Sequence, residues 1–215
     1  MSRVTLFSLI VQIFASGFAV GQQVPKRVVA EHFTNTYCSI CAARNPGLFA
    51  TMWQYPQVLH IAYHPSSPYA ACPLNRYNTA ENDERTKYYG VYGGTPQLVV
   101  QGDRITSAFT DTTIYTARLN QTTSFDMTAF LRTKGADSVT VNIVVKKVAA
   151  SSLSALQLFG AIVEDTLFFS ASNGEQQHFD VFRKSLWGVT PLAVAAPAAV
   201  GDSTVYMKTI LADAA

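Results

Sequence analysis

The spacing of apolar and polar residues predicts alternating strands and helices in the first half of the chain. Two runs, Arg27–Phe33 and Gln57–Tyr63, are rich in apolar and β-prone residues and have the length of strands. Between them, Ala42–Gln54 has the pattern of a helix. A strand, a helix and a second strand in succession are typical of a sheet covered by helices.

The same alternation continues to about residue 122. Asn75–Tyr89 is a polar stretch of helical character that Gly90 ends. Gly93–Val100 predicts a turn leading into a buried strand, and Thr106–Gln121 predicts a further helix. The order β-α-β-α-β-(β)-α is the one expected of an α/β sandwich.

From Thr123 onward, strand patterns replace helical ones. Ser138–Lys147 and Ala155–Val163 alternate over much of their length, and turn formers separate them. Several short strands with such punctuation favour an antiparallel β-sandwich. We therefore predict a two-domain chain, with an α/β domain over residues 22–122 and an all-β, sandwich-like domain over residues 123–215.

The first 21 residues have the pattern of a secretory signal peptide. Arg3 provides the positive start, Val4–Phe18 is almost wholly apolar, and Ala19–Gly21 offers the small residues that a signal peptidase reads. The alternative is an uncleaved anchor, but the apolar run is short of the roughly 20 residues that a bilayer span needs. We expect export to an oxidising compartment, the periplasm or the cell surface of a bacterium.

Composition and charge narrow the classes of function. With 16 Lys and Arg against 14 Asp and Glu, the net charge is only +2, so neither nucleic acid nor an anionic membrane surface is an expected partner. Hydrophobic residues make up 48% of the chain, enough for a core without covalent staples. Three cysteines are too few for a disulfide scaffold.

The most informative chemistry is the pair Cys38 and Cys41, two residues apart. Such a pair suits redox exchange or metal binding, and its place at a strand-to-helix turn lets the helix N-terminus favour a thiolate. We favour a redox-active dithiol over a permanent structural disulfide. A Cys3His zinc site would need Cys72 with His64 or His60, and no second pair at metal-ligand spacing supports it.

The residues around the pair suggest further roles. Cys38, at the helix N-terminus and nearer solvent, is the expected attacking thiolate, and Cys41 the resolving thiol. Cys72 is interpreted as a partly buried free thiol rather than a third redox thiol. His64 is interpreted as a loop histidine rather than a site residue.

Residues 28–102 resemble a thioredoxin-like domain. Pro46 stands five residues after Cys41, where thioredoxins kink their active-site helix, and Gly94–Val99 resembles the segment that carries their cis-proline. The resemblance implies that Pro96 faces the disulfide and that the backbone of Thr95 is a docking edge for a substrate peptide.

The resemblance also implies roles for neighbouring residues, although several positions differ from the thioredoxin pattern. Gly94 and Tyr37 are expected to contact substrate beside Thr95, although Tyr37 stands where the usual residue is Trp. His32, six residues before Cys38, occupies the place of a buried Asp, and we expect it to carry the proton of the second cysteine. The two residues between the cysteines are Ser-Ile rather than the Gly-Pro of thioredoxins. The reduction potential of thioredoxins therefore cannot be assumed for this chain.

Four further segments are similar to the Omp28-related outer membrane proteins of Bacteroidetes and their relatives: Glu31–Cys38, Ile61–His64, Tyr88–Pro96 and Val163–Lys184. That family combines a thioredoxin-like domain with a β-sandwich domain. Its members typically continue beyond a point like Lys208. The resemblance therefore raises the expectation that Ala215 is a truncated or altered end and that the second domain lacks its closing strand.

Together these observations predict an exported thiol–disulfide oxidoreductase acting on protein cysteines. Its redox group is the Cys38–Cys41 disulfide, with no further cofactor and no metal, and a redox partner protein must renew it. Substrate cysteines would dock beside Thr95 and Pro96. The alternative is a non-catalytic envelope protein for binding or assembly that uses the thioredoxin fold as a scaffold. Without a series of lipid-facing strands, membrane association would be peripheral at most.

Overall fold

Strand β2 (Val28–Phe33) is the centre of the main sheet, because five of its six residues are buried. A strand buried on both faces is normally a continuous apolar run. Here Glu31 and His32 interrupt that run, and both are buried. The two side chains point to opposite faces of the sheet, since successive residues of a strand alternate.

The computed structural model describes residues 21–133 and 138–211. The predicted signal peptide, Gly21 excepted, and the predicted altered end at Ala215 lie outside the described residues. The described chain is a mixed α/β protein in which strands predominate and helices are few. Its helices are α1 (Ser39–Met52), α2 (Pro73–Arg76), α3 (Thr79–Tyr88) and α4 (Thr113–Leu119).

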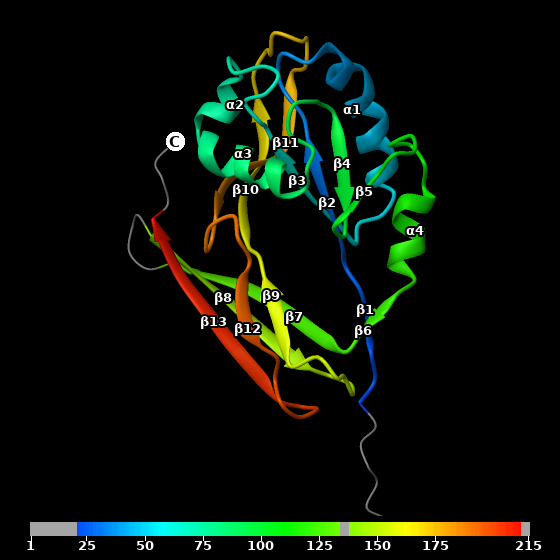
Figure 1. The fold of residues 1–215 in the computed structure, drawn as a ribbon, viewed down its shortest axis with the longest axis vertical. Helices are drawn as coiled ribbons and strands as arrows, with labels where there is room; N and C mark the ends of the chain where they lie inside the picture. The colour runs from blue at the N-terminus through cyan, green and yellow to red at the C-terminus, as the bar shows by residue number, and fades with distance from the viewer. Residues whose placement is uncertain (1–20, 134–137, 212–215) are drawn as a thin grey trace, which may run out of the picture.

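The main sheet has six strands in the order β10-β11-β3-β2-β4-β5. Strands β2, β3 and β11 are parallel to one another, and the outer pairs are antiparallel. Besides β2, the strands are β3 (Val58–Tyr63), β4 (Gln97–Val100), β5 (Asp103–Arg104), β10 (Ala161–Phe168) and β11 (Gln177–Ser185). Helices α1 and α4 lie on one side of this sheet and α2 and α3 on the other (Figure 1).

A second group of strands lies at the other end of the molecule (Figure 1). An antiparallel three-stranded sheet, β13-β8-β7, shares an apolar core with the two-stranded sheet β12-β9. These strands are β7 (Phe125–Thr133), β8 (Ser138–Lys147), β9 (Ala155–Leu158), β12 (Leu192–Ala195) and β13 (Ser203–Leu211). Two short strands, β1 (Val24–Pro25) and β6 (Thr122–Thr123), pair where the chain passes between the two groups.

The predicted separation at residue 123 does not hold for β10 and β11. Both come from the stretch assigned to the sandwich, yet β11 pairs with β3, with Val181 opposite Ala62. The predicted strand Ala155–Val163 is likewise divided into β9 and β10, which belong to different sheets. Gly160 lies at the break, where a Cβ atom would stand 2.5 Å from the side chain of Leu186. Alternation alone reveals that a strand exists, not which sheet it joins.

Two predicted helices are shorter than expected. The stretch Asn75–Tyr89 is divided into α2 and α3 because Asn78 caps α3, its side chain accepting the backbone N–H of Glu81. The predicted helix Thr106–Gln121 begins only at Thr113, whose backbone N–H and hydroxyl both donate to the Asp111 carboxylate. In both cases a local side-chain bond to the backbone sets the boundary.

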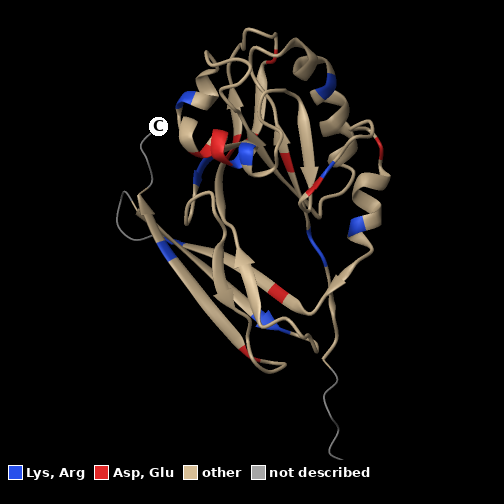
Figure 2. Cartoon of the chain, viewed as in Figure 1, with Lys and Arg blue, Asp and Glu red and all other residues tan. Residues whose placement is uncertain are grey.

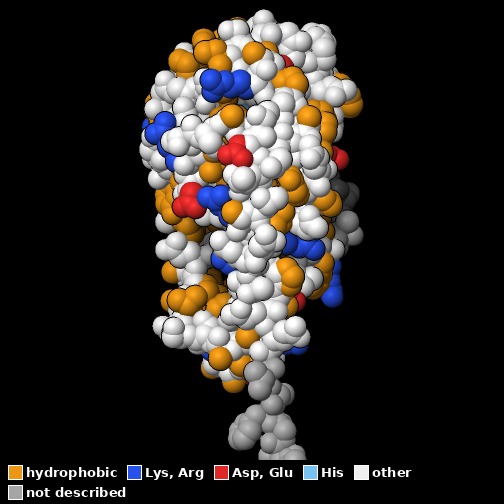
Figure 3. Space-filling model, turned by 90° about the vertical axis from the view of Figure 1, so that its right-hand side faces the viewer, with side chains coloured by type: hydrophobic (Ala, Val, Ile, Leu, Met, Phe, Trp, Pro, Cys, Tyr) orange, Lys and Arg blue, Asp and Glu red, His pale blue; other side chains and the backbone are white. Residues whose placement is uncertain are grey.

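Charged residues are sparse, and neither the basic nor the acidic ones are concentrated in one region (Figure 2). On the face in Figure 3, apolar side chains are dispersed among polar ones and charged groups stand singly or in pairs. No helix among the described residues has the length and apolar character needed to cross a membrane.

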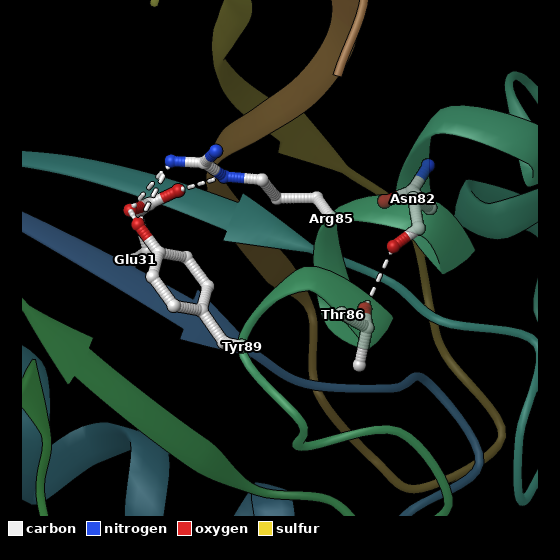
Figure 4. A network of polar contacts seen from close by, with 5 residues as sticks. All are labelled: Glu31, Asn82, Arg85, Thr86 and Tyr89. Carbon is white, nitrogen blue, oxygen red and sulfur yellow. Dashed lines mark hydrogen bonds and ion pairs between the residues drawn. The ribbon is translucent and has the colours of Figure 1, made fainter. Parts of the chain in front are cut away.

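A buried ion pair joins β2 to α3 on the face opposite α1 (Figure 4). The Arg85 guanidinium donates to both carboxylate oxygens of Glu31, at 2.7 and 3.1 Å, and each side chain is only 6% exposed. The Tyr89 hydroxyl donates to the same carboxylate. Burial, and then the Glu31 charge, raises the pKa of the Tyr89 hydroxyl, so it remains a donor at neutral pH. The network ties the strand that leads to Cys38 to the helix behind it.

Removing one partner of this pair should be costly. We predict that Glu31→Gln lowers the free energy of unfolding by about 3 kcal/mol, since it leaves the Arg85 charge buried without a counter-ion. The matched control is Asp103→Asn, which breaks the ion pair with Arg118 on a side chain that is 73% exposed. That change should cost below about 1 kcal/mol. Urea unfolding of both variants measures the difference, and equal losses would contradict the prediction.

Candidate active site

A disulfide joins Cys38 and Cys41 at the start of α1. Cys38 is the N-cap of the helix, and its sulfur accepts the backbone N–H of Cys41 at 3.0 Å. The sequence predicted this place at the strand-to-helix turn. After reduction, the same N–H and the positive end of the helix dipole would stabilise a Cys38 thiolate.

Both cysteines are buried. Cys38 is 2% exposed and Cys41 fully covered, so the expectation that Cys38 lies nearer solvent holds only by this small margin. Two residues near Cys38 are exposed to solvent instead, Tyr37 at 40% and Ile40 at 56%. A partner that reaches Cys38 therefore meets these two side chains first, which is compatible with the substrate contact predicted for Tyr37.

The segment before β4 lies against the disulfide. The Thr95–Pro96 peptide bond is cis, and the Thr95 carbonyl oxygen lies 3.6 Å from the Cys38 sulfur. This proximity follows from the antiparallel pairing of β4 with β2, which places Gln97 opposite Phe33. Pro96 is buried, and Gly94 is half-buried at the edge of the segment. The structure thus places Thr95 beside Cys38, while the docking roles of Thr95, Pro96 and Gly94 stay predictions.

His32 lies on the α1 face of the sheet. Its ring is surrounded by the rings of Phe49, Phe109 and His60, with centroids 6.1, 6.4 and 5.7 Å away. Neither ring nitrogen has a hydrogen-bond partner in the described part of the chain, so no hydrogen bond joins it to a cysteine. Burial, and then the neighbouring histidines, hold the pKa of His32 well below its usual 6.5, which keeps the ring neutral at pH 7.

All four histidines of the chain are buried, a property that the sequence did not reveal. Burial, and then His178 and Arg183, lower the pKa of His64 to about 3. Burial also lowers the pKa of His178. A small cavity with room for about one water molecule lies between them, lined by Thr34, Asn45, Phe49, Ala62, His64, Glu175, Gln177, His178 and Phe179.

The turn between β10 and β11 contributes residues that sequence reasoning missed. The Asn173 backbone N–H donates to the Thr36 carbonyl at 3.0 Å. The Asn173 side-chain amide lies 3.2 and 3.1 Å from the carbonyl oxygens of Asn35 and Cys38. Glu175 accepts the amide of Asn45, on α1, at 2.7 Å. Their only sequence signal was the Asn-Gly-Glu turn within the family-like segment, which says nothing about what the turn contacts.

Cys72, the third cysteine, is fully buried and free. The Thr36 hydroxyl donates to its sulfur at 3.2 Å, so Cys72 accepts a hydrogen bond from the loop that precedes Cys38. The alternative zinc site would need Cys72 together with both cysteines of the disulfide. Among the described residues, no group of three or more His, Cys, Asp or Glu side chains is placed to hold a metal ion.

No family model matches the sequence, and no curated protein does so either. Among solved structures, HBP35 of Porphyromonas gingivalis is similar, with a TM-score of 0.67 and 16% identity over 86% of this chain and 64% of that chain. Protein AGR_C_4864 of Agrobacterium tumefaciens is also similar, with a TM-score of 0.56 and 17% identity over 89% of this chain and 81% of that chain. This chain thus spans less than two thirds of HBP35. At these identities the likeness concerns the fold alone. The likeness to HBP35 and the cysteine pair are compatible with a thioredoxin-like fold.

The buried histidines predict loss of stability in acid. His64 binds a proton in the unfolded chain below about pH 6.5 but in the folded chain only near pH 3, so protonation favours unfolding across that window. At about 1.36 kcal/mol per tenfold change in proton affinity, the full effect, reached near pH 3, is on the order of 5 kcal/mol. Urea unfolding between pH 7 and 4 should show the decline, and His64→Gln should make it less steep, with His32 and His178 accounting for the remainder. An unchanged slope in that variant would contradict the assignment to His64.

Proposed function

We propose that the protein is a thiol–disulfide oxidoreductase that acts on cysteines of other proteins. The observation that carries the proposal is the Cys38–Cys41 disulfide at the N-terminus of α1, with the Thr95 carbonyl oxygen 3.6 Å from the Cys38 sulfur. A dithiol at a helix N-terminus is where thiol exchange is favoured. The Thr95 backbone beside it offers an extended peptide a place to dock.

The proposed exchange moves two electrons in two steps. A substrate thiolate attacks Cys38, which forms a mixed disulfide and releases Cys41 as a thiolate that takes up a proton. The second substrate thiolate attacks the substrate sulfur of the mixed disulfide and releases Cys38. The substrate is oxidised to a disulfide, and the protein is left as a dithiol. In the reverse direction Cys38 attacks a substrate disulfide, Cys41 resolves the mixed disulfide, and a partner protein returns the electrons.

His32 is proposed as the transient proton acceptor for Cys41. In the resolving step Cys41 must lose its proton before it attacks. A neutral imidazole accepts a proton, and burial keeps His32 neutral. Its ring nitrogens are without partners in the described structure, so accepting a proton there breaks no existing hydrogen bond. Because its pKa is low, His32 would hold this proton only transiently.

We further propose that the chain is an exported, Omp28-related protein that combines a thioredoxin-like domain with a β-sandwich. In this proposal the thioredoxin-like unit includes β10 and β11, which extend the sheet of β2 and β3. The sandwich is formed by β7, β8, β9, β12 and β13 around one apolar core. Localisation would be the periplasm or the outer envelope, with peripheral membrane contact at most and a redox protein as partner.

The burial of the pair favours one rival function. With Cys38 at 2% exposure, the disulfide is as well covered as many that serve structure alone. In that case the protein is a non-catalytic envelope binding or assembly protein, and the disulfide fixes the loop before α1.

Activity of single-cysteine variants tests the proposal. We predict that Cys38→Ser abolishes the dithiothreitol-driven reduction of insulin, because no thiolate then remains at position 38 to attack the insulin disulfide. The matched control is Cys72→Ser, which removes a buried thiol outside the pair and should leave turnover within about twofold of the wild type. Equal turnover in wild type and Cys38→Ser would exclude the oxidoreductase.

The reduction potential separates the two candidate functions. Equilibration with glutathione, followed by thiol trapping, should place the Cys38–Cys41 couple between about −270 and −120 mV, the range of catalytic dithiols. The position within that range gives the direction of the reaction. A potential well below about −300 mV is typical of structural disulfides and would favour the binding protein.

A further inference from the structure

The turn between β10 and β11 holds the backbone of Cys38 and of the loop that precedes it. Asn173 lies 138 residues from Asn35 in sequence, yet its amide is 3.2 Å from the Asn35 carbonyl oxygen and 3.1 Å from that of Cys38. Its backbone N–H donates to Thr36 at 3.0 Å. These contacts reach the loop between β2 and α1 from Asn35 to Cys38, the N-cap of the helix. The position of Cys38 therefore depends on a turn in the second half of the chain.

Glu175 extends these hydrogen bonds to helix α1. Its two carboxylate oxygens accept the Asn173 amide at 2.6 Å and the Asn45 amide at 2.7 Å. Asn45 lies one helical turn after Cys41 and is almost fully buried. The carboxylate thus connects the turn to α1, while the Asn173 amide is shared among this carboxylate and the carbonyl oxygens of Asn35 and Cys38.

These contacts have consequences for both states of the dithiol. In the oxidised state they hold the loop against the helix, which keeps Cys38 in place for ring closure with Cys41. In the reduced state the Glu175 charge, linked to Cys38 through one amide, opposes a negative charge on the Cys38 sulfur. Both effects favour the disulfide over the dithiol.

We propose that Asn173 and Glu175 are positioning residues for the Cys38–Cys41 pair, which make the couple more reducing than its helix N-terminus alone would. The inference deepens the proposed oxidoreductase function and assigns the regulation of its site to the β10–β11 turn. Among the described residues neither side chain hydrogen-bonds a cysteine sulfur, so Asn173 acts through the backbone of Cys38 and Glu175 through its charge and the side chain of Asn45.

The test compares three variants of the full chain in glutathione buffers. Glu175→Gln removes the charge and keeps the size. It should shift the equilibrium three- to tenfold toward the dithiol, which is about 15–30 mV more oxidising. It should also lower the Cys38 thiol pKa, read from the pH dependence of alkylation with the label mapped to Cys38. Asn173→Ala should shift the equilibrium at least threefold in the same direction.

Gln176→Ala is the matched control. Gln176 is exposed, and its amide group bonds only within the turn, to Ser170 and Gly174, among the described residues. It should leave both the potential and the pKa unchanged. Values for Glu175→Gln and Asn173→Ala within twofold of the wild type, or an equal shift in Gln176→Ala, would overturn the inference.

Two features keep this test distinct from that of the proposed function. The potential and the thiol pKa are measured without a protein substrate, so they are defined even if insulin turnover is absent. Thermal melts of the oxidised proteins check folding, and if Asn173→Ala is unfolded, Glu175→Gln alone decides. A shift without turnover would uphold the positioning role and exclude the enzyme, whereas turnover without a shift would do the reverse.

Discussion

The parallel pairing of β11 with β3 is the constraint on which the site depends. It places Val181 opposite Ala62 and allows the His60 ring to meet the Asp180 carboxylate at 2.9 Å, across 120 residues of sequence. Because β10 and β11 form an antiparallel hairpin, fixing one strand also fixes the turn between them. That turn then lies against the loop before Cys38. The pairing of β11 with β3 thus determines which residues of the second half of the chain surround the cysteines.

Local patterns in the sequence gave the elements near the cysteines. The predicted helix Ala42–Gln54 and strand Gln57–Tyr63 correspond to α1 and β3, because an apolar pattern and a flanking turn belong to one stretch of chain. The place of Cys38 at the N-terminus of α1 followed from the same neighbours. The proximity of Thr95 to Cys38 could not be predicted from local patterns, because it depends on the pairing of β4 with β2. Only the resemblance to thioredoxins predicted it.

The remaining site residues lacked any local signature. Asn173 and Glu175 belong to a polar turn that resembles any other hairpin turn, and their contacts exist only because β11 joins the main sheet. The burial of His64 and His178 has the same origin, since each histidine is ordinary within its own segment. Strand patterns reveal which residues alternate but leave the choice of sheet open, and that choice here moved two strands across the predicted boundary at residue 123.

In the proposed oxidoreductase, the properties of the dithiol arise from small opposing effects rather than from one strong charge. The first turn of α1 holds no acidic residue and its last turn no basic one, so the helix dipole acts on Cys38 without compensation from its own helix. A helix N-terminus favours an anion by about 0.3–1 kcal/mol at an exposed site and up to about 2 kcal/mol at a partly buried one. Glu175 is half-buried, so solvent weakens its opposing effect. Because about 1.4 kcal/mol corresponds to 30 mV for a two-electron couple, each contribution moves the potential by a fraction of the range that catalytic dithiols cover. Substitutions in the hairpin turn would therefore adjust the couple while the two cysteines and their helix stay the same.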